Sequence, residues 1–358
     1  LEEVEITSQE LFDQIKGEAL CIRAWAHFNL VQLYAKRYEA GKDNTQDGIP
    51  YREKAVAEEQ ARNSVEDVYA KINNDLDEAL SGIKVNDVNH YSEMVAWGLK
   101  ARVALAMQDY NNAAVYAGKS VSLAEAGGHR LMTGSQLNCG FANITTDTKE
   151  AMYAAMTPDD KTVYFYSYYA YMSWNFNSSA IRQGVKCINV DAYETMSETD
   201  LRRAWWDPTG EASVPSSSYA KNAYQNRKFT ADAVGDVAFM RLAEMYLTQA
   251  EALARAGKDS EAQAVFTKFQ ITRDPSYVSK GNIGDALAEE IMNSRRVELW
   301  GEGFRFYDLK RLHMSIKRGS NFDIAFCTFL EKDKDAQGWV WEIPKIETDF
   351  NSLCTKNY

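Results

Sequence analysis

The sequence predicts a mostly α-helical protein made of paired helices, with one loop-rich lobe that contains short strands. Apolar residues recur every three or four positions across residues 17–126 and again across 236–313, which is the spacing of one buried helix face. Residues 127–235 lose that period and are rich in Tyr, Trp, Asn, Ser and Gly. A chain of 358 residues, 45% of them hydrophobic, is long enough to bury a large core.

Two helices are expected near the N-terminus. The first lies within Gly17–Tyr38, and the second begins after Ser64, whose hydroxyl is a typical helix N-cap. The apolar positions are Leu20, Trp25, Phe28 and Leu33 in the first, and Val68, Ile72, Leu76 and Leu80 in the second. Because each helix has one apolar face, we expect the two to pack together.

Residues 94–126 predict a helix, a short turn and a second helix. Setting Trp97 at the aromatic position of the first helix gives the segment a resemblance to a tetratricopeptide repeat. The small residues that would let the two helices approach closely are Ala101, Ala113 and Ala117. A second partial match begins at Tyr246, with corresponding positions at Ala250, Leu253, Gly257, Ala262 and Phe266.

A further helix is expected from Phe239 to Leu253, because its apolar residues share one helical face. Gly257 stands where this helix would end, and Asp259 or Ser260 would cap the next one. The same stretch of sequence therefore contains a complete helix pair.

The lobe of residues 127–235 is predicted to consist of loops and short strands. Tyr164, Tyr166 and Tyr168 alternate as on one face of a strand, and Asp207–Ser218 has the Pro, Gly and Ser content of a surface loop. The uncharged stretch 162–181 is long enough to span a bilayer. Its many polar residues argue against a transmembrane segment.

Acidic and basic residues alternate with aromatic ones across residues 295–311. Glu298, Glu302 and Asp308 are candidate catalytic carboxylates, since glycoside hydrolysis uses a pair of acids. Acids and arginines three or four residues apart on packed helices more often form ion pairs. We therefore interpret this block as a paired structural network.

Four blocks occur in order along the chain: GEALCIRAWAHFNLVQLYAKRY with DGIPY, then DVAFMRLAEMYLTQAEALARAG, EEIMNSRRVELWGEGFRFYDLKRL and the closing WEIPKIETDFN. Their ordered combination resembles the SusD/RagB-like family of nutrient-binding lipoproteins of Bacteroidetes outer membranes. The DLRR that precedes Trp205 and Trp206 also resembles a structural motif of this family, so we expect at least one of these tryptophans in the core.

The resemblance implies a single domain over residues 1–358, with about four tetratricopeptide-like helix pairs. The scaffold would cover approximately 17–126 and 236–313, the ligand-binding lobe 127–235 and a C-terminal tail 314–358. It implies a non-catalytic, surface-exposed protein that captures an oligosaccharide or polysaccharide for a partner SusC-like TonB-dependent transporter. A lipid anchor in the outer membrane, outside the visible sequence, is expected as well.

The candidate ligand residues come from the chemistry of sugars, whose apolar faces stack on aromatic rings while their hydroxyl groups bind amides. The stretch YFYSYYAYMSWNFNSS in the lobe supplies both kinds of group. The candidates are Trp174, Asn175, Tyr171, Asn177, Tyr168 and Tyr169. The alternative is that these tyrosines pack within strands, where aromatic residues are common.

Other functional classes have less support. A formal net charge of -11 argues against a nucleic-acid partner. No cofactor motif is present, and the four histidines do not have metal-ligand spacing. Asp43 and Asp47 do not match an EF-hand, and we interpret them as solvated loop acids instead of a calcium site. A glycan-cleaving enzyme and a tetratricopeptide scaffold for a protein or peptide remain the alternative functions.

Overall fold

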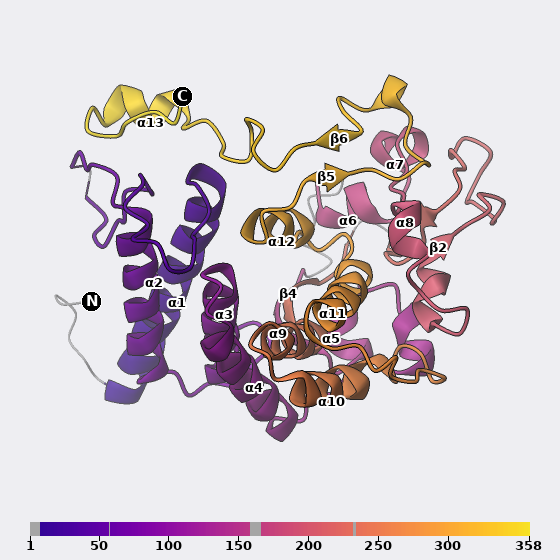
Figure 1. Cartoon of the computed structure of the whole chain (residues 1–358), viewed down its shortest axis with the longest axis horizontal. Coiled ribbons are helices and arrows are strands. Elements are labelled where there is room, and N and C mark those ends of the chain that lie inside the picture. The colour runs from indigo at the N-terminus through magenta and orange to yellow at the C-terminus, as the bar shows by residue number, and fades with distance from the viewer. Residues whose placement is uncertain (1–7, 57, 158–165, 232–233) are drawn as a thin grey trace.

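The N-terminal half of the protein begins with two paired helices. The computed structural model describes residues 8–56, 58–157, 166–231 and 234–358. Helix α1 (Gln9–Tyr34) starts earlier than the expected Gly17, because the Ser8 hydroxyl accepts a hydrogen bond from the Leu11 amide at 3.3 Å. Helix α2 (Val65–Leu80) is capped by Ser64, as predicted, and packs against α1 (Figure 1).

Helices α3 (Glu93–Ala106) and α4 (Tyr110–Ala126) form the second pair. Ala101, Ala113 and Ala117 are completely buried, as expected of small residues where two helices approach closely. Helix α4 also packs against α9, which continues the stack toward the C-terminal half of the scaffold (Figure 1).

The third pair consists of α9 (Leu242–Arg255) and α10 (Asp259–Gln270). Gly257 follows α9 with a φ of +75°, and the next amide bonds back to Leu253 at 2.9 Å, so the predicted helix end is confirmed. The predicted cap at Asp259 or Ser260 was wrong, because helix α10 begins at Asp259 and its N-cap residue is Lys258, whose side chain makes no capping bond. Helices α11 (Gly284–Glu298) and α12 (Arg305–Arg311) complete the scaffold, and α11 packs on α9.

The prediction that Phe239 begins a helix was wrong. It lies in strand β4 (Val237–Arg241), which pairs antiparallel with β1 (Ala151–Ala155). The Phe239 ring packs on Tyr153 of the partner strand at 5.6 Å and on Trp25 at 5.5 Å. These long-range ring contacts favour the extended conformation, and the helix starts only after Arg241.

Between α4 and β4 the described residues form short elements. They are the 3₁₀ helices η1 (Gly134–Asn138) and η3 (Leu201–Trp205), helices α5 (Ile144–Asp147), α6 (Tyr168–Met172), α7 (Ser179–Gln183) and α8 (Val190–Tyr193), and strands β1, β2 (Trp206–Asp207) and β3 (Gln225–Asn226). Strand β2 pairs antiparallel with β3. A mostly helical protein with paired helices and short strand pairs confirms the predicted fold class.

The predicted strand of alternating tyrosines was wrong at Tyr166 and Tyr168, and Tyr164 lies outside the described residues. Tyr166 is in a turn, and Tyr168 is the first residue of α6. The hydroxyl of Ser167 accepts a hydrogen bond from the Ala170 amide at 3.1 Å, which stabilises a helix start at this point.

The described core has one large cluster under the helix pairs and a second in the lobe. Trp205 and Trp206 belong to the second cluster and are 1% and 3% exposed, so the expected core role is confirmed for both. The Trp205 indole N–H donates to the Leu137 carbonyl at 2.6 Å, which satisfies the buried polar group.

The C-terminal segment crosses the top of the molecule in Figure 1, from the lobe back to α1. It contains β5 (Ile316–Lys317), which pairs with β6 (Glu331–Lys332), then η4 (Ile324–Phe326) and α13 (Lys345–Phe350). The Trp341 amide donates to the Leu33 carbonyl at 2.8 Å, near the end of α1. No helix among the described residues has the length and hydropathy needed to cross a membrane.

Candidate functional site

The acidic residues of the C-terminal block lie in buried ion pairs. Glu298 is completely buried and accepts bonds from three arginines: Arg273 at 2.9 Å, Arg241 at 3.0 Å and Arg202 at 3.3 Å. Burial alone would raise the pKa of the Glu298 carboxyl, but these guanidinium groups outweigh it and hold the pKa well below its usual range.

Glu302 belongs to the same network. It accepts from Arg241 at 2.7 Å and from Lys228 at 2.6 Å. Burial opposes its ionisation, and the charges of Arg241 and Lys228 nevertheless lower the pKa of Glu302. Both carboxylates are therefore ionised hydrogen-bond acceptors that have no proton to give.

Asp308 forms a second network. It accepts from Arg295 at 3.0 Å and from Arg311 at 2.8 Å, and Arg311 also bonds to Glu251 at 2.7 Å. All four side chains are at least nine-tenths buried. The interpretation of this block as a paired structural network is confirmed, and the three acids are already occupied by cations.

The lobe residues expected to bind a sugar lie in and just after α6. The Trp174 indole N–H donates to the Thr230 hydroxyl at 2.9 Å, and the Arg227 guanidinium lies 4.1 Å from the ring centroid. One face of the indole is therefore covered by a cation. The side-chain oxygen of Asn175 accepts from the Ala231 amide at 3.1 Å, which ties the two segments together.

The other predicted residues lie in different surroundings. Tyr171 is 46% exposed and Asn177 is also exposed, so both side chains are open to solvent. Tyr169 is only 2% exposed, and the one proton of its hydroxyl is shared between the Phe141 and Asp236 carbonyls, which lie 2.7 and 2.8 Å away. Its ring packs in the lobe core and also lines the cavity described next, so its role in binding stays a prediction.

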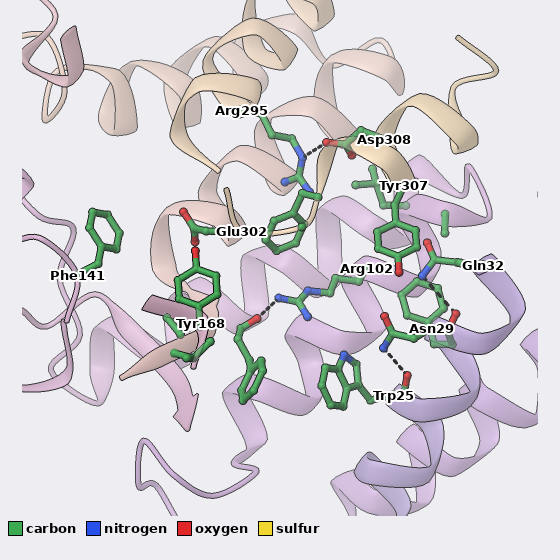
Figure 2. A pocket seen from close by; sticks show the side chains of 18 of the residues that line it. Trp25, Asn29, Gln32, Arg102, Phe141, Tyr168, Arg295, Glu302, Tyr307 and Asp308 are labelled. Atoms are coloured by element: carbon green, nitrogen blue, oxygen red, sulfur yellow. Dashed lines mark hydrogen bonds and ion pairs between the residues drawn. The ribbon is translucent and has the colours of Figure 1, made fainter. Parts of the chain in front are cut away.

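Tyr168 lines a cavity that was not predicted from the sequence. The cavity has a volume of about 340 Å³ and lies between α1, α3, β4 and α12. Tyr168 lines it from the lobe side, with its hydroxyl donating to the Gly301 carbonyl at 3.1 Å. Figure 2 shows Tyr168 and Glu302 on one side of this space and Trp25, Asn29 and Gln32 on the other.

Helix α1 supplies one wall of the cavity with groups of fixed orientation. The Asn29 amide donates to the Trp25 carbonyl at 2.8 Å, and the Gln32 amide donates to the Phe28 carbonyl at 3.3 Å. These bonds to the preceding helical turn hold each amide group in place on the same wall as the Trp25 ring, with Asn29 between Trp25 and Gln32 (Figure 2). The wall therefore offers an aromatic surface next to amide groups, which is a combination suited to a polar ring such as a sugar.

The centre of the cavity contains Arg102 and Tyr307. Arg102 forms two bonds to Glu244, at 2.6 and 2.7 Å, and its guanidinium lies 5.2 Å from the centroid of the Phe304 ring. In Figure 2 the Tyr307 hydroxyl points into the space beside Arg102 and Gln32. Burial raises the pKa of Tyr307, so its hydroxyl stays protonated and can donate a hydrogen bond.

These cavity residues were missed because they come from segments far apart in the chain. Trp25 was assigned to the buried face of a helix and Tyr307 to the charged block. One signal was available: Asn29 and Gln32 lie within one helical turn of Phe28, close to a predicted apolar face. Across the part of the chain that the structure describes, no cluster of three metal-ligating side chains occurs.

The paired helices, the irregular lobe and the cavity lined by aromatic rings define a tetratricopeptide-like scaffold protein with a ligand-sized site. The sequence model of the SusD family matches residues 31–352, and this chain belongs to that family. A SusD-like protein of Formosa agariphila is 31% identical over 90 residues, which cover 23% of this chain and 18% of that relative.

Solved structures of Bacteroides proteins share the fold. One from Bacteroides vulgatus has a TM-score of 0.83 at 22% identity, covering 99% of this chain and 79% of that chain. A SusD-like carbohydrate binding protein from the same species has a TM-score of 0.79 at 23% identity, covering 98% of this chain and 78% of that one. At this identity the likeness establishes the fold.

Proposed function

We propose that this protein captures an oligosaccharide without cleaving it. The observation that carries the proposal is the cavity, where Trp25 shares one wall with the held amides of Asn29 and Gln32 and lies opposite Tyr168 (Figure 2). Membership of the SusD family and the structural likeness to a carbohydrate binding protein support a sugar as the ligand.

The state of the carboxylates supports binding without hydrolysis. A glycosidase needs one protonated acid and one free carboxylate beside the scissile bond. Glu302 and Asp308 line the cavity, but each accepts two cationic donors and has a lowered pKa. Neither is able to donate a proton near neutral pH. No reducing ends should be released from any glycan that the protein binds.

The captured glycan would be passed to a SusC-like TonB-dependent transporter at the surface of the outer membrane. Membership of the SusD family supports this role. Its test is co-purification of a TonB-dependent transporter with a tagged copy of this protein from outer membranes. A protein that fractionates away from the outer membrane, or that never retains a transporter, would contradict it.

The binding site is tested by two sets of variants against a panel of glycans in calorimetry. The cavity set is Trp25→Ala and Gln32→Leu, and the lobe set is Trp174→Ala and Tyr171→Ala. Removing one stacking or hydrogen-bonding group at the centre of a site costs about 2 kcal/mol or more, which is a loss of affinity of roughly thirtyfold. We expect this loss in the cavity set.

The lobe set keeps the sequence-based hypothesis open to test. A loss confined to Trp174→Ala and Tyr171→Ala would place the sugar on the exposed lobe around Asn175 and Asn177 instead. Asn73→Ala serves as a control, because Asn73 lies on α2 and lines neither surface. If the wild-type protein bound no glycan of a broad panel, the proposed function itself would be wrong.

A further inference from the structure

A second cavity lies on the other side of Phe304 from the first. It has a volume of about 390 Å³ and is bounded by α8, by the turn between α11 and α12, and by Phe322. The Phe304 ring lines both cavities, and the guanidinium groups of Arg102 and Arg295 each lie 5.2 Å from its centroid. The Phe304 ring therefore forms part of the wall of both cavities, and the two guanidinium groups hold it in position.

The walls of this second cavity are aromatic rings with fixed positions. The Trp300 ring stacks on Phe229 with a centroid distance of 6.3 Å and meets Trp206 edge-on at 5.8 Å. The Phe306 ring stacks on Trp339 at 5.7 Å. Rings held in this way offer flat apolar surfaces that lose little conformational entropy when a ligand binds.

Two arginines that line the same cavity have no carboxylate partner. Among the described residues, no acid lies within 4.0 Å of the guanidinium of Arg296 or Arg305, and neither group makes a hydrogen bond. Asp308, the acid that lines this cavity, already accepts from Arg295 and Arg311. The neighbouring arginines are therefore neutralised, while these two are not.

The electrostatic surroundings agree with this geometry. Burial lowers the pKa of Arg296 to about 10, the charge of Arg305 adds to the lowering, and the more distant charge of Asp191 offsets only part of it. Burial also lowers the pKa of Arg305, and the nearby Asp308 offsets only part of that effect. Two partly buried like charges without a partner are costly, and an anion placed between them would remove much of that cost.

We propose that this second cavity binds an acidic sugar, with Arg296 and Arg305 holding its carboxylate or sulfate group. Guanidinium groups bind oxyanions through paired, charge-assisted hydrogen bonds, and the aromatic walls would contact the apolar face of the sugar ring. The sugar part of this inference rests on the proposed function. The oxyanion part rests on the unpaired arginines and the cavity alone.

The experiment compares glucuronic acid, glucose 6-sulfate and glucose by calorimetry on the whole protein. At least one acidic sugar should bind tenfold or more tightly than glucose, and Arg296→Gln and Arg305→Gln should each abolish that preference. Arg52→Gln removes the same charge outside the cavity and should leave it unchanged. Equal affinity for all three sugars, or a preference that survives both cavity variants, would overturn the proposal.

Failure of this inference is distinguishable from failure of the proposed function. A neutral glycan bound in the first cavity should keep its affinity in Arg296→Gln and Arg305→Gln. If neutral glycans bind and no acidic sugar is preferred, only the inference is wrong. If no neutral glycan binds while the acidic sugars do so through these arginines, the inference holds and the first cavity is not the sugar site.

Thermal unfolding of the unliganded variants supplies a second readout. Because Arg296 has no partner to lose, Arg296→Gln should melt at the same temperature as the wild type or a few degrees higher. If an arginine forms a stabilising ion pair in the folded protein, its replacement by glutamine lowers the melting temperature instead. A melting temperature lower by more than about 5 °C would show that Arg296 has a structural role and would overturn the assignment of a ligand-binding role to it.

Discussion

The helical scaffold and the irregular lobe are stabilised in different ways. In the scaffold, small and aliphatic residues such as Ala101, Val103 and Leu247 pack in the interfaces between long helices. In the lobe, short elements are held at their ends by side chains, as when Ser178 accepts from the Ile181 amide at 3.2 Å. Buried arginines join the two, since Arg202 of the lobe and Arg273 after α10 share Glu298. Order in the lobe therefore depends on a charge network that belongs to the scaffold.

The largest expected effect comes from breaking that shared network. Glu298→Gln leaves Arg202, Arg241 and Arg273 without their common carboxylate, and breaking a buried pair in this way costs on the order of 3–5 kcal/mol. Urea unfolding measures the change, with Glu289→Gln on the exposed face of the same helix as the control. A loss below about 1 kcal/mol would contradict the network's importance.

A change in the lobe core should separate the two regions. Trp205→Leu removes a buried indole and its bond to the Leu137 carbonyl, and we expect a cost of about 3 kcal/mol from the cavity and the orphaned acceptor. Hydrogen exchange should accelerate in residues 134–147 and 200–207 while the α1–α2 pair stays protected. Equal acceleration throughout would mean that the lobe and the scaffold unfold as one unit.

The ends of the scaffold should respond to pH through Lys310. Its amino group donates to the Gln32 and Ala35 carbonyls at the end of α1, and burial lowers the pKa of Lys310 to about 7. An unfolded lysine titrates near 10.5, so between these pH values the unfolded chain binds more protons and stability rises with pH. Below pH 7 Lys310 is protonated in both the folded and the unfolded state, so burial of its charge destabilises the folded protein to the full extent.

The measurement is the difference in unfolding free energy between the wild type and Lys310→Met. Relative to the variant, the wild type should gain about 1–2 kcal/mol of unfolding free energy from pH 6.5 to pH 8.5. The comparison cancels the titration of other groups. A difference that stays constant over this range would show that Lys310 remains charged in the folded protein.

The smallest expected effect is local to the scaffold. Ser64→Ala removes the hydroxyl that accepts from the Asp67 amide at 3.1 Å, and should cost about 1 kcal/mol. Thermal unfolding detects this change, and Ser122→Ala on an exposed part of α4 is the control. Glycan affinity should be unchanged in both variants, because neither serine lines the first cavity.

The scaffold was predictable because its signals are local and periodic. Ser64 and Gly257 mark a helix start and a helix end through backbone chemistry that is visible in the sequence. Phe239 was assigned to a helix because its spacing fitted one. Its extended conformation is favoured by contacts with the Trp25 and Tyr153 rings. These residues are far away in the sequence, so the local pattern around Phe239 does not reveal the contacts.

The candidate site was less predictable for a related reason. Composition alone identified the tyrosine-rich stretch of the lobe, yet it did not separate Tyr169, which packs in the core, from Tyr171, which is exposed. The first cavity forms where α1, α3 and α12 meet in space. Arg102 and Tyr307 do not belong to any local sequence motif that would indicate a binding site. Such a site appears only when the tertiary arrangement is known.

The β1–β4 pairing has a consequence for how such proteins diversify. Ala155 stands opposite Val237, so the chain leaves the scaffold and returns to it at one place. The entropy needed to close a loop between two such anchors grows slowly with its length. Changing the length of an exposed loop between these strands therefore costs little entropy, but Arg202 and Lys228 of this segment have to keep their bonds to Glu298 and Glu302. Grafting a relative's segment that keeps these two cations between the strands would test whether the lobe sets the ligand preference.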